Sequence, residues 1–148
     1  MSWSLNFGGK VLQAANDNPA TIKEMLHDRL DKALRAIFGG PRDFVFGIEM
    51  TKDGRWHAHG ALDGTVDERP AAERALRRAG GTWGSERHQE KQAHTDVLWG
   101  PDGWARYVLK GMSKTKDRLG IKSVLSVTRG CRERAEGLWN ASRSAHEQ

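Results

Sequence analysis

The sequence has few of the residues from which disulfides, zinc clusters and membrane spans are built. Its 148 residues include one cysteine, Cys131, which excludes an internal disulfide framework and a cysteine-based zinc cluster. We expect Cys131 to be a small structural residue. No apolar run approaches the roughly 20 residues of a membrane span, and the N-terminus lacks the apolar core of a signal peptide. These absences predict a cytoplasmic protein that does not enter the membrane.

The charge balance is basic, with 24 Lys+Arg residues against 19 Asp+Glu residues, a formal net charge of +5 and a pI near 9.7. Such a chain attracts anionic partners, which are nucleic acids and acidic membrane surfaces. The basic tract from Lys114 to Lys122 favours nucleic acid, although charged runs are also common on solvated surfaces.

The length predicts one domain over residues 1–141 with a flexible tail over 142–148, and leaves no room for a motor ATPase module.

Apolar periodicity and turn residues predict a mixture of strands and helices. The expected strands cover 3–7, 44–50, 55–62, 93–99 and 124–127, and the expected helices cover 22–38, 70–79, 103–112 and 132–139. Thr21 and Glu24 suit a capping box for the first helix, and Asp102 suits the cap of the third. A polar segment over 16–19 is expected to interrupt the chain. Because the two central strands form a hairpin, the expected fold class is α+β with a central antiparallel β-sheet flanked by helices.

Two histidines in the hairpin are candidate metal ligands. His57 and His59 are separated by one residue in a strand, so their side chains leave the same face and can converge on one ion. This spacing alone is also common in structural histidines. Two imidazoles with a carboxylate and open coordination positions suit a catalytic divalent ion, whereas a structural zinc site would need four protein ligands.

The turn between the two strands decides whether Glu49 joins the histidines. Residues 51–54 suit a type I turn followed by a left-handed glycine, which pairs Thr51 with Arg55 and therefore Glu49 with His57. A two-residue loop would instead turn Glu49 away from the histidines. The alternative role of Glu49 is a salt bridge to an arginine.

Tyr107, the only tyrosine, is a candidate nucleophile. Its position in the expected helix lies about 130° from the centre of the apolar stripe formed by Val108 and Met112. Lys110 follows at i+3, where a cation favours the phenolate over the phenol, whose ordinary pKa is about 10. The alternative is a surface tyrosine beside solvated lysines.

In combination these motifs resemble the HUH endonuclease superfamily, in particular the rolling-circle replication initiator (Rep) proteins. The shared features are an acidic strand (46–50), a tight turn (51–54), a His-hydrophobic-His strand (56–60) and a later Tyr-x-x-Lys helix (107–110), in the family's order. Residues 3–7 are similar to the family's first motif. The resemblance covers about residues 3–112.

The resemblance implies a sequence-specific nicking and joining enzyme for single-stranded DNA. Tyr107 would be the nucleophile that forms a 5′-phosphotyrosine and frees a 3′-hydroxyl, Lys110 its helper, and Glu49, His57 and His59 the ligands of Mg²⁺ or Mn²⁺. We expect a monomer in a bacterial cell or in the host cell of a plasmid or phage. No glycine-rich phosphate loop is present, so unwinding is expected to depend on a separate helicase or the host replication machinery.

Several basic and aromatic residues are expected along the DNA path. They are Lys114, Lys116, Arg118, Lys122, Arg55 and Trp56, with Trp83, Trp99 and Trp104 as further candidates for base stacking or for the core. His94 is a candidate extra polar group near the site, although we favour the interpretation that it is incidental. Three alternatives stay open: a single-tyrosine relaxase or transposase with the same chemistry, a hydrolase that activates water, and a non-catalytic nucleic-acid-binding module.

Overall fold

The computed structural model describes residues 1–98 and 100–146. Within these ranges it does not describe the side chains of Glu86, Arg87, Pro101, Asp102, Trp104, Tyr107, Lys110, Ala145 and His146. The elements are β1 (Ser2–Asn6), α1 (Gly9–Asp17), η1 (Pro19–Thr21), α2 (Ile22–Phe38), β2 (Phe44–Met50), β3 (Trp56–Leu62), η2 (Val66–Glu68), α3 (Arg69–Gly80), α4 (Glu86–Gln89), β4 (Ala93–Asp96), α5 (Pro101–Leu119), β5 (Leu125–Val127) and α6 (Arg129–His146).

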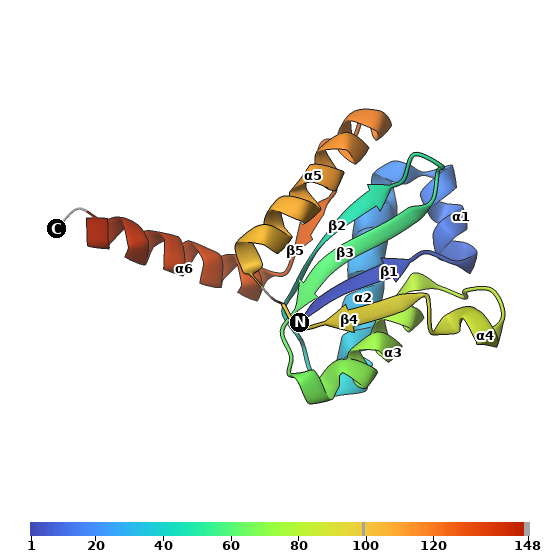
Figure 1. Ribbon diagram of the computed structural model, residues 1–148, viewed down its shortest axis with the longest axis horizontal. Coiled ribbons are helices and arrows are strands. Elements are labelled where there is room, and N and C mark those ends of the chain that lie inside the picture. The colour runs from blue at the N-terminus through green and yellow to red at the C-terminus, as the bar shows by residue number, and fades with distance from the viewer. Residues whose placement is uncertain (99, 147–148) are drawn as a thin grey trace.

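The strands form one five-stranded sheet in the order β4-β1-β3-β2-β5 (Figure 1). Each pair of neighbours is antiparallel. Helices α2 and α3 lie behind the sheet in Figure 1, and α5 lies on the opposite side near β2. The predicted α+β class with a central antiparallel sheet flanked by helices is therefore confirmed.

The hydrophobic core lies between the sheet and helices α1, α2 and α3. Strand residues alternate between the two faces, and the set that includes Leu5, Phe46 and Ala58 is fully buried against these helices. Leu26 and Leu34 of α2 and Leu76 of α3 fill the same core. The next residue along each strand faces the opposite side, where the candidate ligands lie.

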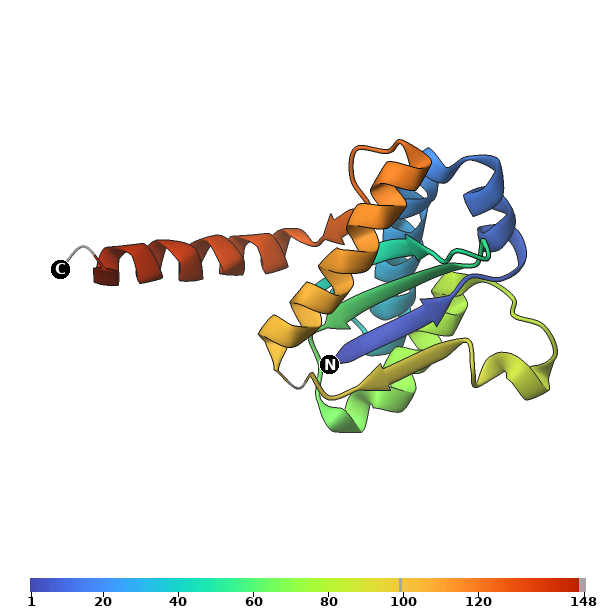
Figure 2. The ribbon, with the colours of Figure 1, turned by 45° about the horizontal axis from the view of Figure 1, so that its top comes forward.

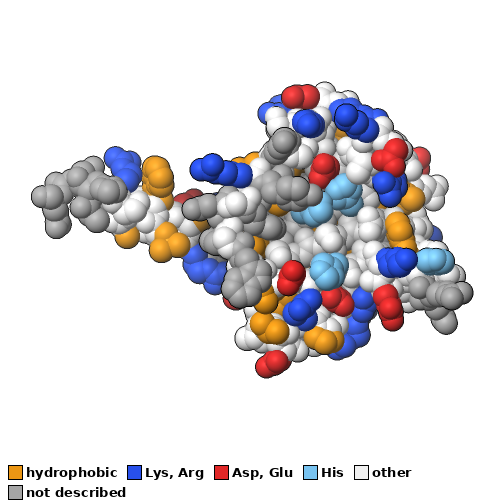
Figure 3. Space-filling view, in the orientation of Figure 1, with side chains coloured by type: hydrophobic (Ala, Val, Ile, Leu, Met, Phe, Trp, Pro, Cys, Tyr) orange, Lys and Arg blue, Asp and Glu red, His pale blue; other side chains and the backbone are white. Residues whose placement is uncertain are grey.

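Helix α5 packs on that opposite face because β2 carries a glycine there. A Cβ at Gly47 would lie 2.0 Å from Sδ of Met112 and 3.4 Å from Cγ1 of Val108, so only hydrogen fits between strand and helix. Val108 and Met112 are each 7% exposed at this contact. Figure 2 shows α5 crossing the sheet on this side, close to β2 and β5. In the part of this face formed by β1, β3 and β4, the described side chains are partly or fully exposed (Figure 3).

Helix α1 was not predicted from the sequence. Val11 and Ala15 are buried in it, and Gly9–Asp17 is too short for a strong periodic pattern.

The capping box predicted for α2 is wrong. The Thr21 hydroxyl donates to the Asn18 carbonyl at 3.2 Å and makes no hydrogen bond that caps the helix.

The C-terminal third departs further from the predicted boundaries. Strand β4 ends at Asp96, and α5 has Gly100 rather than Asp102 as its N-cap and continues to Leu119. Helix α6 begins at Arg129 and continues through the residues predicted as a tail, as far as His146. It projects away from the sheet (Figures 1 and 2), with Arg134 bound to Asp43 at 2.9 Å near its base. No helix in the described ranges combines the length and apolar composition that crossing a bilayer requires.

We expect Gly47→Ala to lower the free energy of unfolding by roughly 1–3 kcal/mol, because the new methyl group overlaps Met112 and pushes α5 from the sheet. Urea unfolding measures the change. Gly40→Ala is the control, since a Cβ there meets nothing within 4 Å. Equal stability of the two variants would contradict the close packing of α5 on β2.

Candidate metal centre

The β2–β3 loop sets the register of the hairpin. The Thr51 amide donates to the Arg55 carbonyl at 2.9 Å and the Gly54 amide to the Thr51 carbonyl at 3.0 Å. Gly54 has a φ of +81°, which places it in the left-handed region. Glu49 is consequently opposite His57, and Gly47 opposite His59. The predicted loop and register are confirmed.

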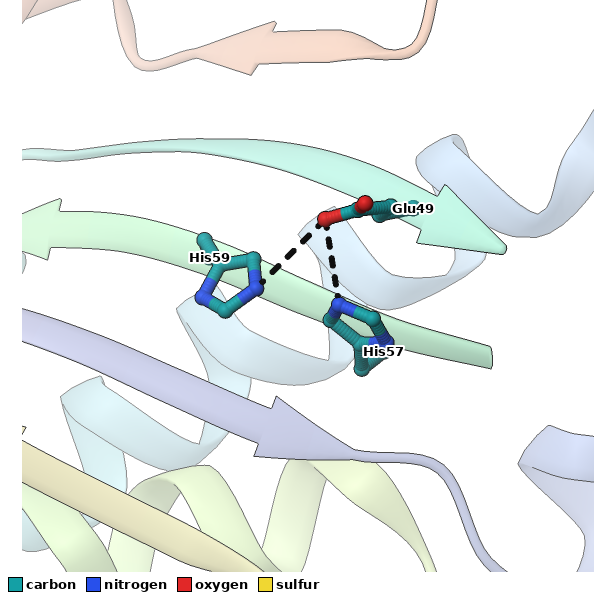
Figure 4. A group of neighbouring side chains, drawn as sticks. All are labelled: Glu49, His57 and His59. Carbon is teal, nitrogen blue, oxygen red and sulfur yellow. Dashed lines mark hydrogen bonds and ion pairs between the residues drawn. The ribbon is translucent and has the colours of Figure 1, made fainter. Parts of the chain in front are cut away.

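The three candidate ligands converge above β2 and β3 (Figure 4). Oε2 of Glu49 lies 3.1 Å from Nε2 of His57 and 3.6 Å from Nε2 of His59. The two imidazole rings meet edge to face, with centroids 4.7 Å apart. One ligand atom from each residue lies within 4.8 Å of the others, which is compatible with a single ion between them.

The three side chains of the candidate centre are partly buried and remain partly accessible to solvent. The side chains of His57, His59 and Glu49 are 16%, 21% and 30% exposed, respectively. Figure 3 shows histidine side chains gathered on this face with acidic side chains beside them. Burial lowers the pKa of the His59 imidazole below 6.5, and the neighbouring His57 lowers it further, while Glu49 raises it. The net decrease favours the neutral imidazole, which is the form that binds metal.

Helix α5 is fastened directly beside this centre. The Met50 amide donates to Oγ1 of Thr115 at 3.1 Å, and the Arg118 guanidinium donates to the Thr51 carbonyl at 2.7 Å. These bonds hold Gly111 over Glu49, where a Cβ would lie 2.7 Å from Cδ of the carboxylate. Gly111 therefore gives the carboxylate its space, a role that the sequence analysis missed.

The backbone of α5 places position 107, which carries the candidate nucleophile, on the same side of the helix as Gly111. Position 107 precedes Gly111 by four residues, so the two positions lie one above the other on one helical face. The side chains of Tyr107 and Lys110 lie outside the described part of the structure. The four-residue spacing can be read from the sequence, whereas the proximity of Gly111 to Glu49 is known only from the structure.

The expected DNA-contacting residues do not form one group. Lys114 and Arg118 follow Gly111 at helical spacing and share its side of α5, whereas Lys116 lies on another side. Lys122 is exposed beyond the end of α5. Arg55 is at the hairpin tip, with its Nε 2.7 Å from Oδ2 of Asp53.

The expected base-stacking role of Trp56 is wrong. Trp56 is 3% exposed, and its indole Nε1 donates to Oδ1 of Asn16 at 2.8 Å. The side chain faces α1 because Trp56 is adjacent to His57 in the strand and so points to the opposite face. Trp99 and the Trp104 side chain lie outside the described residues.

The open face beside the centre is polar. Ser4 of β1 is the register partner of both His59 and His94, so the two histidines lie in one row across three strands. Asn6 is likewise the partner of His57. From the sequence, His94 is only a candidate polar group near the site that we interpret as incidental, because the order of β4 and β1 in the sheet depends on contacts distant in sequence.

Comparison with protein-family models found no matching family. Searches of curated proteins and of solved structures found no match either.

We expect Gly111→Ala to weaken Mn²⁺ binding by about ten-fold, because the methyl group displaces the Glu49 carboxylate from the imidazoles. The electron paramagnetic resonance signal of free Mn²⁺ measures the affinity. Stability should not fall, since alanine favours a helix by about 1 kcal/mol over glycine.

Gly103→Ala is the matched control in the same helix, because a Cβ at that position meets nothing within 4 Å. Unchanged Mn²⁺ affinity in Gly111→Ala would contradict a ligand role for Glu49.

Proposed function

We propose that the protein is a metal-dependent endonuclease of the HUH type, which nicks and rejoins single-stranded DNA through Tyr107. The observation that carries the proposal is the convergence of Glu49, His57 and His59 on an open sheet face beside the helix of the only tyrosine. Position 107 lies one turn from Gly111, which contacts Glu49. A nucleophile and a metal centre beside it are the two parts that this chemistry requires.

The donor set fits one divalent ion. Glu49 offers a carboxylate oxygen and the two histidines offer imidazole nitrogens, which leaves other coordination positions for phosphate oxygens and water. The carboxylate, together with the water and phosphate oxygens that would complete the coordination, suits Mg²⁺ or Mn²⁺. When bound, the ion would supply Lewis-acid polarisation of the scissile phosphate.

In the proposed reaction, Tyr107 replaces the scissile phosphodiester bond of the DNA with a bond to its own oxygen. The Tyr107 oxygen attacks phosphorus and loses its proton, and the bond from phosphorus to the 3′ oxygen breaks. The products are a 5′-phosphotyrosine and a 3′ oxygen that takes up a proton to become a hydroxyl. Lys110 supports the phenolate form at i+3. The phosphotyrosine retains a phosphodiester bond, so the reverse attack by a 3′-hydroxyl joins strands without ATP.

A replication initiator is the biological role that we propose for this chemistry. The net charge of +5 favours binding to DNA, and Lys114 and Arg118 lie on the side of α5 that carries Gly111. Such an initiator would act with a separate helicase or with host replication proteins on an exposed single-stranded site. A relaxase or transposase would use the same residues, and the nature of the joined strands distinguishes these roles.

We expect the wild-type protein to form a covalent adduct with single-stranded DNA in the presence of Mn²⁺, and Tyr107→Phe to form none. The phenyl ring lacks the oxygen that attacks phosphorus. The measurement is a shifted band on a denaturing gel after incubation with a pool of labelled oligonucleotides. Sequencing the trapped strands then identifies the nick site.

Arg35→Ala is the control, since it removes a charge from α2, behind the sheet and away from position 107. Cleavage by Tyr107→Phe at the wild-type rate would instead assign the reaction to water. A protein that binds DNA and never cleaves it would be a binding module.

We expect the double variant His57→Ala, His59→Ala to lose Mn²⁺ binding and adduct formation together, because only the carboxylate ligand remains. Excess EDTA should stop the wild-type reaction, and added Mn²⁺ should restore it in the wild type alone. His88→Ala, which changes a histidine of α4 that is not in the cluster, is the control. Full activity in EDTA would refute the metal assignment.

A further inference from the structure

A second concave site lies outside the candidate metal centre, between α2, the end of α3 and the connection that leads to β4. Its volume is about 330 Å³. The described residues that line it include three arginines, one tryptophan and two glutamines, and none of them is a carboxylate: Arg29, Arg77, Arg78, Gly81, Thr82, Trp83, Gln89 and Gln92. We call it the arginine–tryptophan pocket.

The wall of this pocket is held in place by contacts distant in sequence. The Gln92 side chain, 2% exposed, donates to the Gly81 carbonyl at 2.6 Å and to the Asn6 carbonyl at 3.4 Å. Gly81 has a φ of +84°, and a Cβ there would lie 2.5 Å from the Gly8 carbonyl oxygen. The connection therefore packs against the end of β1, and these contacts fix the wall of the pocket.

The pocket carries excess positive charge. Arg29 donates to the Ala79 and Arg78 carbonyls at 2.7 and 3.1 Å, so it neutralises the negative end of helix α3. Arg77 has one long ion pair, 3.7 Å to Glu73, whose other oxygen accepts two hydrogen bonds from Thr95. Arg78 is exposed and adds another cation. An anionic ligand fits this charge.

The uncharged lining residues distinguish a nucleotide from a simple anion. Trp83 offers an aromatic surface on which a base can stack. Gln89 offers a side-chain amide that both donates and accepts hydrogen bonds, as base edges require. Phosphate recognition by arginine beside base recognition by tryptophan is the arrangement expected of a single-stranded nucleic-acid site.

The pocket connects to the metal centre through β1. Gln92 binds the carbonyl of Asn6, and Asn6 is the register partner of His57. The Asn6 side chain also donates to the Lys91 carbonyl at 3.2 Å. Because α2 and α3 lie on the other side of the sheet from the candidate metal centre, a DNA strand bound at both places would pass round the end of β1, at Asn6 and the exposed Lys91.

We propose that the arginine–tryptophan pocket binds one nucleotide of single-stranded DNA, with its base on Trp83 and its phosphate on Arg78. This inference rests on the proposed function for the identity of the strand, and the nucleotide lies on the same strand as the scissile phosphate but outside the reacting position. The pocket contributes affinity and base preference, and takes no part in bond breaking.

Fluorescence anisotropy with a labelled, random-sequence single-stranded DNA tests the proposal in EDTA, where cleavage plays no part. We expect Trp83→Ala to weaken binding by about ten-fold and Trp83→Phe to retain most of the affinity. Trp139→Ala is the matched control, because that tryptophan is 65% exposed on α6. Thermal unfolding of each variant verifies that the fold is intact.

Arg78→Ala should weaken binding and reduce the slope of log affinity against log salt by about 0.7, the contribution of one phosphate contact to single-stranded DNA. Arg35→Ala, which removes an arginine of α2 outside the pocket, should leave that slope unchanged.

The proposal would be overturned if Trp83→Ala bound single-stranded DNA as tightly as Trp139→Ala does. It would also be overturned if Trp83→Ala weakened binding of a DNA duplex as much as binding of the single strand. Equal effects of Arg78→Ala and Arg35→Ala would also overturn the proposal, because Arg78 would then act only as part of a general basic surface. Because no cleavage is measured, these outcomes are independent of whether Tyr107 forms an adduct.

Discussion

The antiparallel pairing of β2 with β3 is the constraint on which the candidate site depends. Glu49 faces His57 because the loop between the strands contains the left-handed Gly54. A shift of one residue would move every side chain of one strand to the other face and replace Glu49 with an apolar residue. The same register places Gly47 where α5 needs space. One hairpin thus positions both the donor atoms and the helix beside them.

Two glycines, one in β2 and one in α5, then determine how closely the tyrosine-bearing helix packs beside the candidate metal centre. Gly47 admits Met112, and Gly111 leaves room for the Glu49 carboxylate. Thr115 and Arg118 bind the end of β2 and the hairpin loop, which fixes the helix along its length. Since α5 covers only one side of the sheet face, the polar strands beside it remain open to a ligand.

Local patterns accounted for the elements that the sequence analysis predicted correctly. The hairpin follows from strand alternation and turn residues within a short segment, and α2 and α3 follow from long periodic runs. Helix α1 was missed because its periodic run is short. Trp56 was assigned to DNA, although its place in the strand beside His57 already directed it to the other face, where it contacts Asn16.

The sequence by itself determined the chemistry available to the candidate site: a pair of histidines one residue apart, a carboxylate in register with them, and a single tyrosine on the helix that packs beside them. These depend on strand geometry and turn type, which act over a few residues. Only the tertiary structure decided that Gly111 lies on Glu49, that His94 joins the row of His59, and that Arg29, Arg78 and Trp83 surround one pocket. These contacts join segments far apart in the chain, so they depend on how helices and strands pack.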